Sequence, residues 1–265
     1  ATSFKIKGKD SLVLTARLGY ENGSAILKKF VFYGNSYSFL TDITLRQMDT
    51  IIQKGYRYVW ADGLKYQEKN ASDESSDAVA MASLNGAIEE INADGADPVT
   101  ANYTGIIDYA ATKTKYFGAA MIPQPYRGFD GTIDLLGRRE FYNSDRIEER
   151  YSMIFRIPYS GGTETNSFRV YIGPLDYDLL NEYHLTDMIN FGWRWLVRPI
   201  GEFFMLPFFK MIYMFVHNYG ISIIIFSIFM KLLLYPLSIT QMRSAQKMQL
   251  IAPEMTKMRE KYKDD

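Results

Sequence analysis

The chain has 265 residues, of which 47% are hydrophobic, and its formal net charge is zero. That length allows one large or two small domains, and the apolar content is ample for a core. The chain has no cysteine, which excludes disulfides and thiolate chemistry, and the neutral net charge gives no sign of direct nucleic-acid binding.

Alternating apolar and polar residues predict β-strands along the first 60 residues. The strand-like runs are SLVLTARL, ILKKFVFY, YSFLTDITL and GYRYVW. Asn22-Gly23 and Gly34-Asn35 lie between these runs and predict hairpin turns. Residues 68–78 are polar and acidic, which predicts a surface loop, and residues 79–99 read as weak strand or loop.

A second group of aromatic-rich strands is predicted downstream. Its runs are NYTGIIDYAA, KYFGAAMIP, GTIDLLGRREFYN, RYSMIFRIPYS and NSFRVYIGP. Many short strands separated by turn signals indicate a β-sandwich, so residues 1–175 are predicted to form one mainly β domain.

The pattern then becomes helical. A short linker helix is predicted within 176–190, followed by an apolar, amphipathic segment over 191–216 that is interrupted by glycines and prolines. Tryptophan and arginine gather at its start, a mixture typical of a membrane interface; the residues are Trp193, Arg194, Trp195 and Arg198. Because the run from Phe203 to Val216 is short for a span, we expect a helix lying on the membrane surface, and the alternative is a second crossing that forms a helical hairpin.

Residues 219–237 form the segment best suited to cross a membrane. Lys231 is the only charged residue in this stretch, whose length just spans a hydrocarbon core of about 30 Å. A cation at membrane depth costs at least about 2.5 kcal/mol unless it is paired or hydrated. Lys231 could therefore serve a hydrated groove inside the membrane, or it could simply extend its stem about 9 Å to the interface near Leu237.

Residues 238–265 predict an amphipathic helix that Pro253 interrupts or restarts. Its apolar residues recur every three or four positions and include Met242, Met248, Ile251, Met255 and Met258. A methionine-rich stripe suits an adaptable contact surface, and the alternative is the first arm of a coiled-coil hairpin.

Charge is unevenly distributed around the predicted span. Residues 239–265 carry six Lys/Arg and four Asp/Glu, whereas residues 1–209 carry 22 and 26. By the positive-inside rule, the basic tail is expected in the cytoplasm and the first domain outside it, in the periplasm of a cell with two membranes. Because the chain opens without a signal peptide and stops within a predicted helix, we also expect it to be a fragment of a longer protein.

Signals for catalysis are poor. The chain has two histidines, and no zinc-ligand spacing, nucleophile elbow, phosphate-binding loop or dinucleotide fingerprint. We therefore expect no enzyme, no cofactor and no metal.

At this point the motifs resemble a known family, the YidC membrane-protein insertases of the bacterial branch with a large periplasmic domain. The stretch 219–265 is similar to the family's first core transmembrane helix, its Tyr-Pro-Leu exit and the first arm of its cytoplasmic hairpin. Similar elements upstream are KYF…IP at 115–123, YIGP at 171–174 and GWRW at 192–195.

The resemblance implies a β-supersandwich like that of galactose mutarotase, followed by helices in the bacterial inner membrane. It also implies an insertase that acts on nascent membrane proteins without nucleotide hydrolysis, alone or with the Sec translocon, the ribosome and signal recognition components. Lys231 occupies the position where the family usually has an arginine in its groove, so the charge is kept but the guanidinium fork is lost.

Two other functions stay open on the sequence alone. The first is a periplasmic binding module for a sugar or a protein partner, held by one membrane anchor. The second is a mutarotase-like enzyme, which would need acid and base groups clustered in a pocket of the sandwich.

Overall fold

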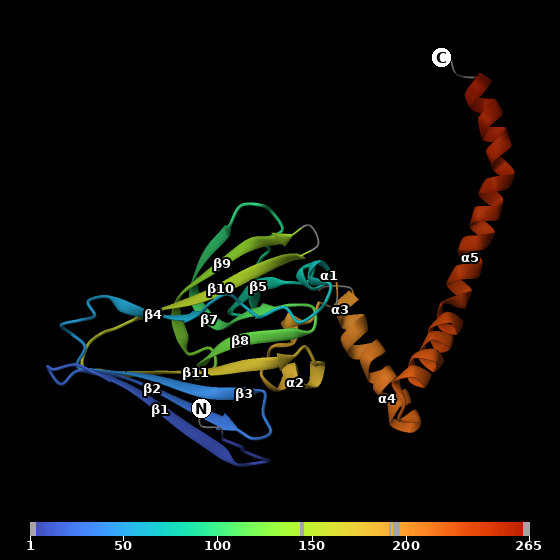
Figure 1. Cartoon of the computed structure of the whole chain (residues 1–265). Helices are drawn as coiled ribbons and strands as arrows, with labels where there is room; N and C mark the ends of the chain where they lie inside the picture. The colour runs from blue at the N-terminus through green and yellow to red at the C-terminus, as the bar shows by residue number, and fades with distance from the viewer. Residues whose placement is uncertain (1–3, 144–145, 191, 193–196, 262–265) are drawn as a thin grey trace. The chain divides into compact units, whose positions relative to one another are not determined.

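A computed structural model describes residues 4–143, 146–190, 192 and 197–261. The chain divides into two compact units, residues 1–189 and 190–265, which we call the β-domain and the helical unit (Figure 1). Each is described by itself.

The β-domain contains a continuous antiparallel sheet of eleven strands, and the predicted strands are confirmed. The main path of hydrogen-bonded strands runs β1-β2-β3-β11-β8-β7-β9-β10-β4, and β5 and β6 form a hairpin that joins it through β7. The strands are β1 (Ser11–Gly19), β2 (Ala25–Tyr33), β3 (Ser38–Arg46), β4 (Gly55–Trp60), β5 (Val79–Leu84), β6 (Ala87–Ile91), β7 (Val99–Lys113), β8 (Phe117–Gln124), β9 (Phe129–Asn143), β10 (Arg146–Pro158) and β11 (Thr163–Pro174). Both predicted hairpin turns lie in the connections on either side of β2.

The sheet curves so that distant strands share one core (Figure 1). Tyr58 of β4, at one end of the path, packs on Phe168 of β11 with ring centroids 4.9 Å apart. Phe155 of β10 meets the same ring edge-on at 5.2 Å. Every second residue of a strand points inward, so the alternation of apolar and polar residues in the sequence places apolar side chains on the inner face of the curved sheet.

Residues 177–189 belong to this domain and do not form a separate linker. The helix α2 (Tyr177–Glu182) and a 3₁₀ turn (Thr186–Met188) contribute Leu180, Leu185 and Met188, all fully buried, to a second core cluster on the sheet. Met188 packs so closely on Gly118 of β8 that a Cβ there would lie 2.3 Å from its terminal methyl. The boundary expected at 175 therefore falls at Ile189.

The surface loop predicted at 68–78 is also corrected, because it contains a short helix, α1 (Ala71–Ser75). Glu74 is only 2% exposed and accepts hydrogen bonds from the backbone N–H groups of Gln67 and Glu68 at 3.0 and 2.9 Å. An acidic residue that composition assigns to the surface thus holds the preceding turn in place.

The helical unit consists of α3 (Val197–Ile200), a π-helical turn (Gly201–Met205), α4 (Leu206–Val216) and α5 (Tyr219–Lys261). Val197–Val216 is continuous, so the helical stretch is longer than the run from Phe203 to Val216 and length alone does not prevent it from spanning; the surface position stays a prediction. Pro199 lies in the first turn of α3 and Pro207 in that of α4, where a missing N–H disrupts least, and the π turn accommodates the junction. The expected break at Pro253 is also absent, because α5 continues through both Pro236 and Pro253.

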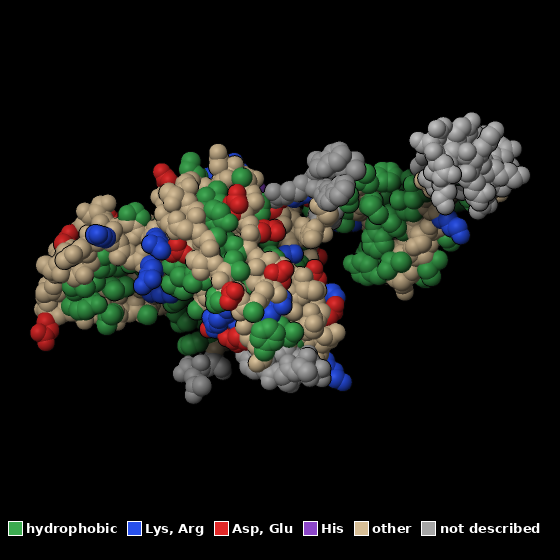
Figure 2. Space-filling model, turned by 90° about the horizontal axis from the view of Figure 1, so that it is seen from above, with side chains coloured by type: hydrophobic (Ala, Val, Ile, Leu, Met, Phe, Trp, Pro, Cys, Tyr) green, Lys and Arg blue, Asp and Glu red, His purple; other side chains and the backbone are tan. Residues whose placement is uncertain are grey.

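Apolar side chains cover the surface of the helical unit, whereas charged groups gather on the β-domain (Figure 2). By length and composition, two stretches could each cross a membrane, Val197–Val216 and Tyr219–Pro236, and only 6% of either is buried. So much exposed apolar surface would be unfavourable in water and indicates a lipid environment.

Candidate functional site: a charged helix face and a basic cleft

A two-residue turn reverses the chain between α4 and α5. His217 adopts a left-handed φ of 53°, and its N–H donates to the carbonyl of Tyr213 at 2.8 Å. Asn218 then caps α5, since its Oδ1 accepts from the N–H of Ile221 at 3.2 Å and its carbonyl accepts from Ser222 Oγ at 2.8 Å. The result is an antiparallel helical hairpin.

Aromatic rings hold the two helices together near the turn. The centroid of Phe208 lies 4.1 Å from that of Phe229 and 6.0 Å from that of Phe226. Tyr213 stacks on Tyr219 at 4.2 Å. Beyond these contacts, α3 and α4 diverge from α5 (Figure 1).

Lys231 lies on the face of α5 that points away from α4. Ser222, which is fully buried against the hairpin, marks the inner face together with Phe226 and Phe229. Lys231 is nine residues after Ser222, about two and a half turns, so it lies on the opposite side of the helix, and its side chain is exposed.

Two serines share the face of Lys231, and the sequence analysis did not single them out. Ser227 precedes it by four residues and Ser238 follows by seven, spacings that keep all three on one side of a helix. Both hydroxyls donate within the helix, to the carbonyls of Ile223 at 2.7 Å and Leu234 at 3.2 Å. Helical spacing from Lys231 would have been enough to find them.

The expected interfacial anchor is described only in part, because Trp193, Arg194 and Trp195 lie outside the described residues. Arg198 Nε contacts Glu202 Oε1 at 3.0 Å, and the side chains are 18% and 14% exposed. This i,i+4 pair neutralises two of the three charges in Val197–Val216, and Lys210 is the third.

The apolar residues expected to form one stripe beyond residue 238 divide between two faces of the continuous helix. Met242 is 63% exposed and, eleven residues after Lys231, lies on the same face. Met248 and Ile251 are 66% and 50% exposed. They lie six and nine residues after Met242, and because three residues are less than one helical turn, each lies further from the Lys231 face. The side chains of Met255 and Met258 lie outside the described part of the chain.

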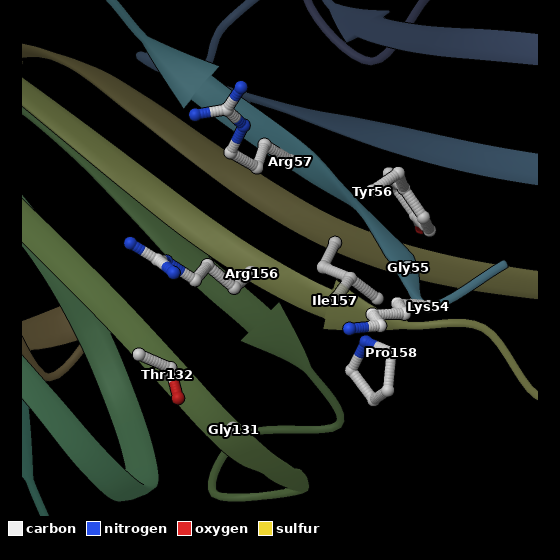
Figure 3. Close-up of a pocket in the computed structure, with 9 residues that line it drawn as sticks. All are labelled: Lys54, Gly55, Tyr56, Arg57, Gly131, Thr132, Arg156, Ile157 and Pro158. Atoms are coloured by element: carbon white, nitrogen blue, oxygen red, sulfur yellow. The ribbon is translucent and has the colours of Figure 1, made fainter. Parts of the chain in front are cut away.

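A second candidate site is a cleft of about 460 Å³ on the outer face of β4, β10 and β9 (Figure 3). Arg57 and Arg156 are direct cross-strand partners there, and Thr132 lies next in the same row. The three side chains point to the same side of the sheet, and Lys54 adds a cation at the end of the cleft (Figure 3).

Only one of the two arginines has a carboxylate partner among the described residues. Arg156 Nε lies 2.6 Å from Asp134 Oδ2, whereas Arg57 is exposed and makes no ion pair with any residue in the described part of the chain. The sequence patterns RYVW and FRIP place each arginine on an outward face, but the register that pairs them is not readable from sequence.

Family models match both parts of the chain. The YidC periplasmic domain matches residues 1–203, and the 60Kd inner membrane protein matches residues 211–265. A membrane protein insertase YidC from Chlorobium phaeovibrioides is 35% identical over 271 residues, covering 100% of this chain and 46% of that protein. One from Chlorobium limicola is 36% identical over 265 residues, covering 98% and 44%.

The chain therefore spans about half the length of the curated relatives it matches. Among solved structures, heparan sulfate lyase HepC from Pedobacter heparinus is similar to 64% of this chain and 21% of that chain. With a TM-score of 0.34 and 11% identity, that likeness carries no argument.

The fold and the helical unit define a class first: a membrane protein in which a mainly β domain precedes apolar helices that carry a few basic residues. The family matches then specify it. The chain belongs to the YidC family of membrane protein insertases. It is an inner-membrane protein whose first 203 residues correspond to the family's periplasmic domain.

Proposed function

We propose that the complete protein inserts membrane proteins, and that Lys231 marks the surface where it receives them. The observation that carries this proposal is the face formed by Ser227, Lys231 and Ser238, which is polar within an apolar helix and turned away from α4. A cation and hydroxyls on one side of a spanning helix keep water and polar groups of another chain at membrane depth. A client's hydrophobic segment then leaves sideways into lipid, with no catalysed reaction and no cofactor.

The proposed topology places residues 1–190 in the periplasm and residues 238–265 in the cytoplasm, with one crossing at 219–237. The charge difference between the two parts supports it. Protease added to sealed spheroplasts should digest the β-domain and spare the tail, and digestion of the tail alone would contradict this topology.

In this proposal α3 and α4 lie along the membrane surface. Phe204 of the π-helical turn and Met211 and Phe215 of α4 follow helical spacing and are 42%, 46% and 76% exposed, which gives a lipid-facing side. Glu202 and Tyr213 lie on the other side, and Phe208 faces α5. Trp193 and Trp195 should then be quenched by shallow rather than deep bromolipids, whereas deep quenching would mean a second crossing.

The test of Lys231 uses the complete protein and a single-span client with an acidic tail. Lys231→Arg should keep insertion because the cation survives, and Lys231→Glu should impair it by repulsion, on the order of 1–3 kcal/mol in a hydrated groove. Lys231→Leu separates a groove from a snorkelling lysine, because only the groove needs the charge. Equal insertion by all three variants at matched protein levels would remove Lys231 from the mechanism.

We propose nascent membrane proteins as the clients, and the Sec translocon, the ribosome and signal recognition components as partners, on the strength of the family resemblance. The exposed residues Met248 and Ile251 support a helix-to-helix contact for the tail, as in the first arm of a coiled-coil hairpin.

The basic cleft favours a second candidate, a periplasmic binding module held by a membrane anchor. The Lys231 series discriminates between them, because a binding module predicts normal client insertion in a cell that makes only Lys231→Glu.

A further inference from the structure

We propose that the cleft on β4, β10 and β9 binds an extended acidic polypeptide, with a carboxylate bound by Arg57 and attracted by the neighbouring Arg156. The inference rests on the proposed function in one respect: the polypeptide is taken to be a client segment that has reached the periplasm.

The first argument is the electrostatic imbalance of the cleft. Like charges directly opposite one another on neighbouring strands destabilise a sheet. Asp134 compensates Arg156 at 2.6 Å, but the described residues offer Arg57 no carboxylate, and Lys54 lines the same cleft. Three cations against one close carboxylate leave a local excess of positive charge that an anion would neutralise.

The second argument is geometric. Arg57 and Arg156 stand side by side in one row of the sheet, and Thr132 extends the row with a hydroxyl (Figure 3). Thr132 Oγ1 lies 3.1 Å from Thr104 Oγ1 on β7, so the polar row crosses four strands. Guanidinium forks bind carboxylates and phosphates in bidentate geometry, and a hydroxyl can donate a further hydrogen bond.

The third argument selects a polypeptide over a small anion. β4 is the last strand of the main path and pairs only with β10 among the described strands. An extended peptide can add to such an edge through its backbone, while its alternate side chains reach the outer face where Arg57 lies. Pro158, which is exposed at the end of β10, supplies an apolar border to the cleft for neighbouring side chains.

The acidic side chain must fall in this cleft and not in its neighbour. An adjoining cleft shares Ile157 and Pro158 but is lined by Asp130 and Glu164. Its carboxylates would repel an acidic residue, so the charge pattern fixes where an acidic segment begins to bind.

The test measures binding to the full chain in detergent by fluorescence anisotropy. The probes are a labelled peptide of alternating aspartate and threonine and its asparagine counterpart of equal length. The acidic peptide should bind about tenfold more tightly than the amide peptide, and high salt should reduce the difference.

Substitutions then locate the site. Arg57→Gln should weaken the acidic peptide about tenfold, and Arg57→Lys should weaken it less because the charge remains without the fork. Arg17→Gln is the matched control, since Arg17 is also an exposed strand arginine but lies on β1 at the other end of the sheet. Near-ultraviolet circular dichroism should be unchanged in all three variants.

Three outcomes would overturn the inference: equal binding of the two peptides, no effect of Arg57→Gln, or an equal effect of Arg17→Gln. Binding of inorganic phosphate that depends on Arg57, without binding of the acidic peptide, would also overturn it in favour of a small-anion site. The binding assay does not measure insertion, so the two proposals can fail separately. Equal insertion by the Lys231 variants with intact peptide binding would refute only the proposed function. Loss of specific peptide binding with the expected Lys231 effects would refute only this inference.

Discussion

A buried carboxylate of the β-domain and an exposed lysine of the helical unit differ in how their charges are satisfied. In the β-domain, Glu149 is 3% exposed, accepts from Arg139 at 2.6 Å and from the Tyr151 hydroxyl at 2.7 Å, and its N–H donates to Tyr66 Oη. In the helical unit, Lys231 is exposed and no described residue pairs with it. The buried charge of Glu149 is thus satisfied within the β-domain, whereas the exposed charge of Lys231 has no partner among the described residues.

Asp108 of the β-domain follows the same rule as Glu149. It is fully buried and accepts from Ser83 Oγ at 2.8 Å, the Gly86 N–H at 2.7 Å and Arg127 Nε at 3.0 Å. Such groups stabilise a domain only while all their partners remain, because an uncompensated buried charge is strongly unfavourable. A charged group that binds another molecule is therefore expected at an exposed position, where it does not already hold internal partners.

The largest effect is expected from breaking this internal pairing. Glu149→Ala leaves Arg139 without its carboxylate and Tyr151 with only the Ala78 carbonyl as acceptor, and it should destabilise the β-domain by about 3–5 kcal/mol. Hydrogen exchange of β9 and β10 amides should accelerate accordingly. Glu21→Ala, at an exposed position in the turn after β1, should change nothing, and an equally small effect at Glu149 would contradict the comparison.

An intermediate effect is expected at high pH, because tyrosines are buried in the β-domain. Burial, and then the charge of Asp176, raises the pKa of Tyr171 to about 12. Below pH 10 the phenol is neutral in both the folded and the unfolded chain, so its contribution is fully present. Between pH 10 and about 12 only the unfolded chain ionises, and stability should fall by on the order of 2 kcal/mol.

Tyr171→Phe tests this sign. The variant loses the 2.6 Å hydrogen bond to the carbonyl of Pro174, so it should be about 1 kcal/mol less stable near pH 8. Above pH 10, however, its stability should fall less steeply than that of the parent chain. Denaturant unfolding across this pH range gives both quantities, with the exposed Tyr20→Phe as control; parallel curves would refute the assignment.

The sequence predicted the strands well because each buries one face, and alternation records that directly. It failed where burial depends on distant groups. Nothing in the polar run at 68–78 shows that Glu74 will be buried as an acceptor for two N–H groups. Composition also assigned 176–190 to a linker, because the docking of Met188 on Gly118 is a tertiary contact.

For the candidate site, a lysine inside an apolar run was visible from the sequence, but the direction it faces was not. That direction follows from the turn at His217 and Asn218 and from the ring contacts between α4 and α5, which are not readable from the sequence. Likewise, the pairing of Arg57 with Arg156 required the strand register. The sequence therefore indicated which residues to consider, but it did not show which residues of other helices or strands lie next to them.

The smallest effect is expected in the hairpin, where packing is confined to a few rings. Phe208→Ala removes the contacts with Phe226 and Phe229, worth about 1 kcal/mol for aromatic pairs at a partly exposed site. Phe203→Ala, at a position 81% exposed, removes no ring contact among the described residues and serves as the control.

Because the chain has no cysteine, spin labels can be attached to cysteines introduced at Lys210 and Ile224 of the full chain in detergent. The distance between the labels should be narrowly distributed in the parent and in Phe203→Ala, and broader in Phe208→Ala. An unchanged distribution in Phe208→Ala would mean that the turn at His217 and Asn218 fixes the hairpin by itself. In that case the turn, and not the ring contacts with α4, would define which face of α5 carries Lys231 outward.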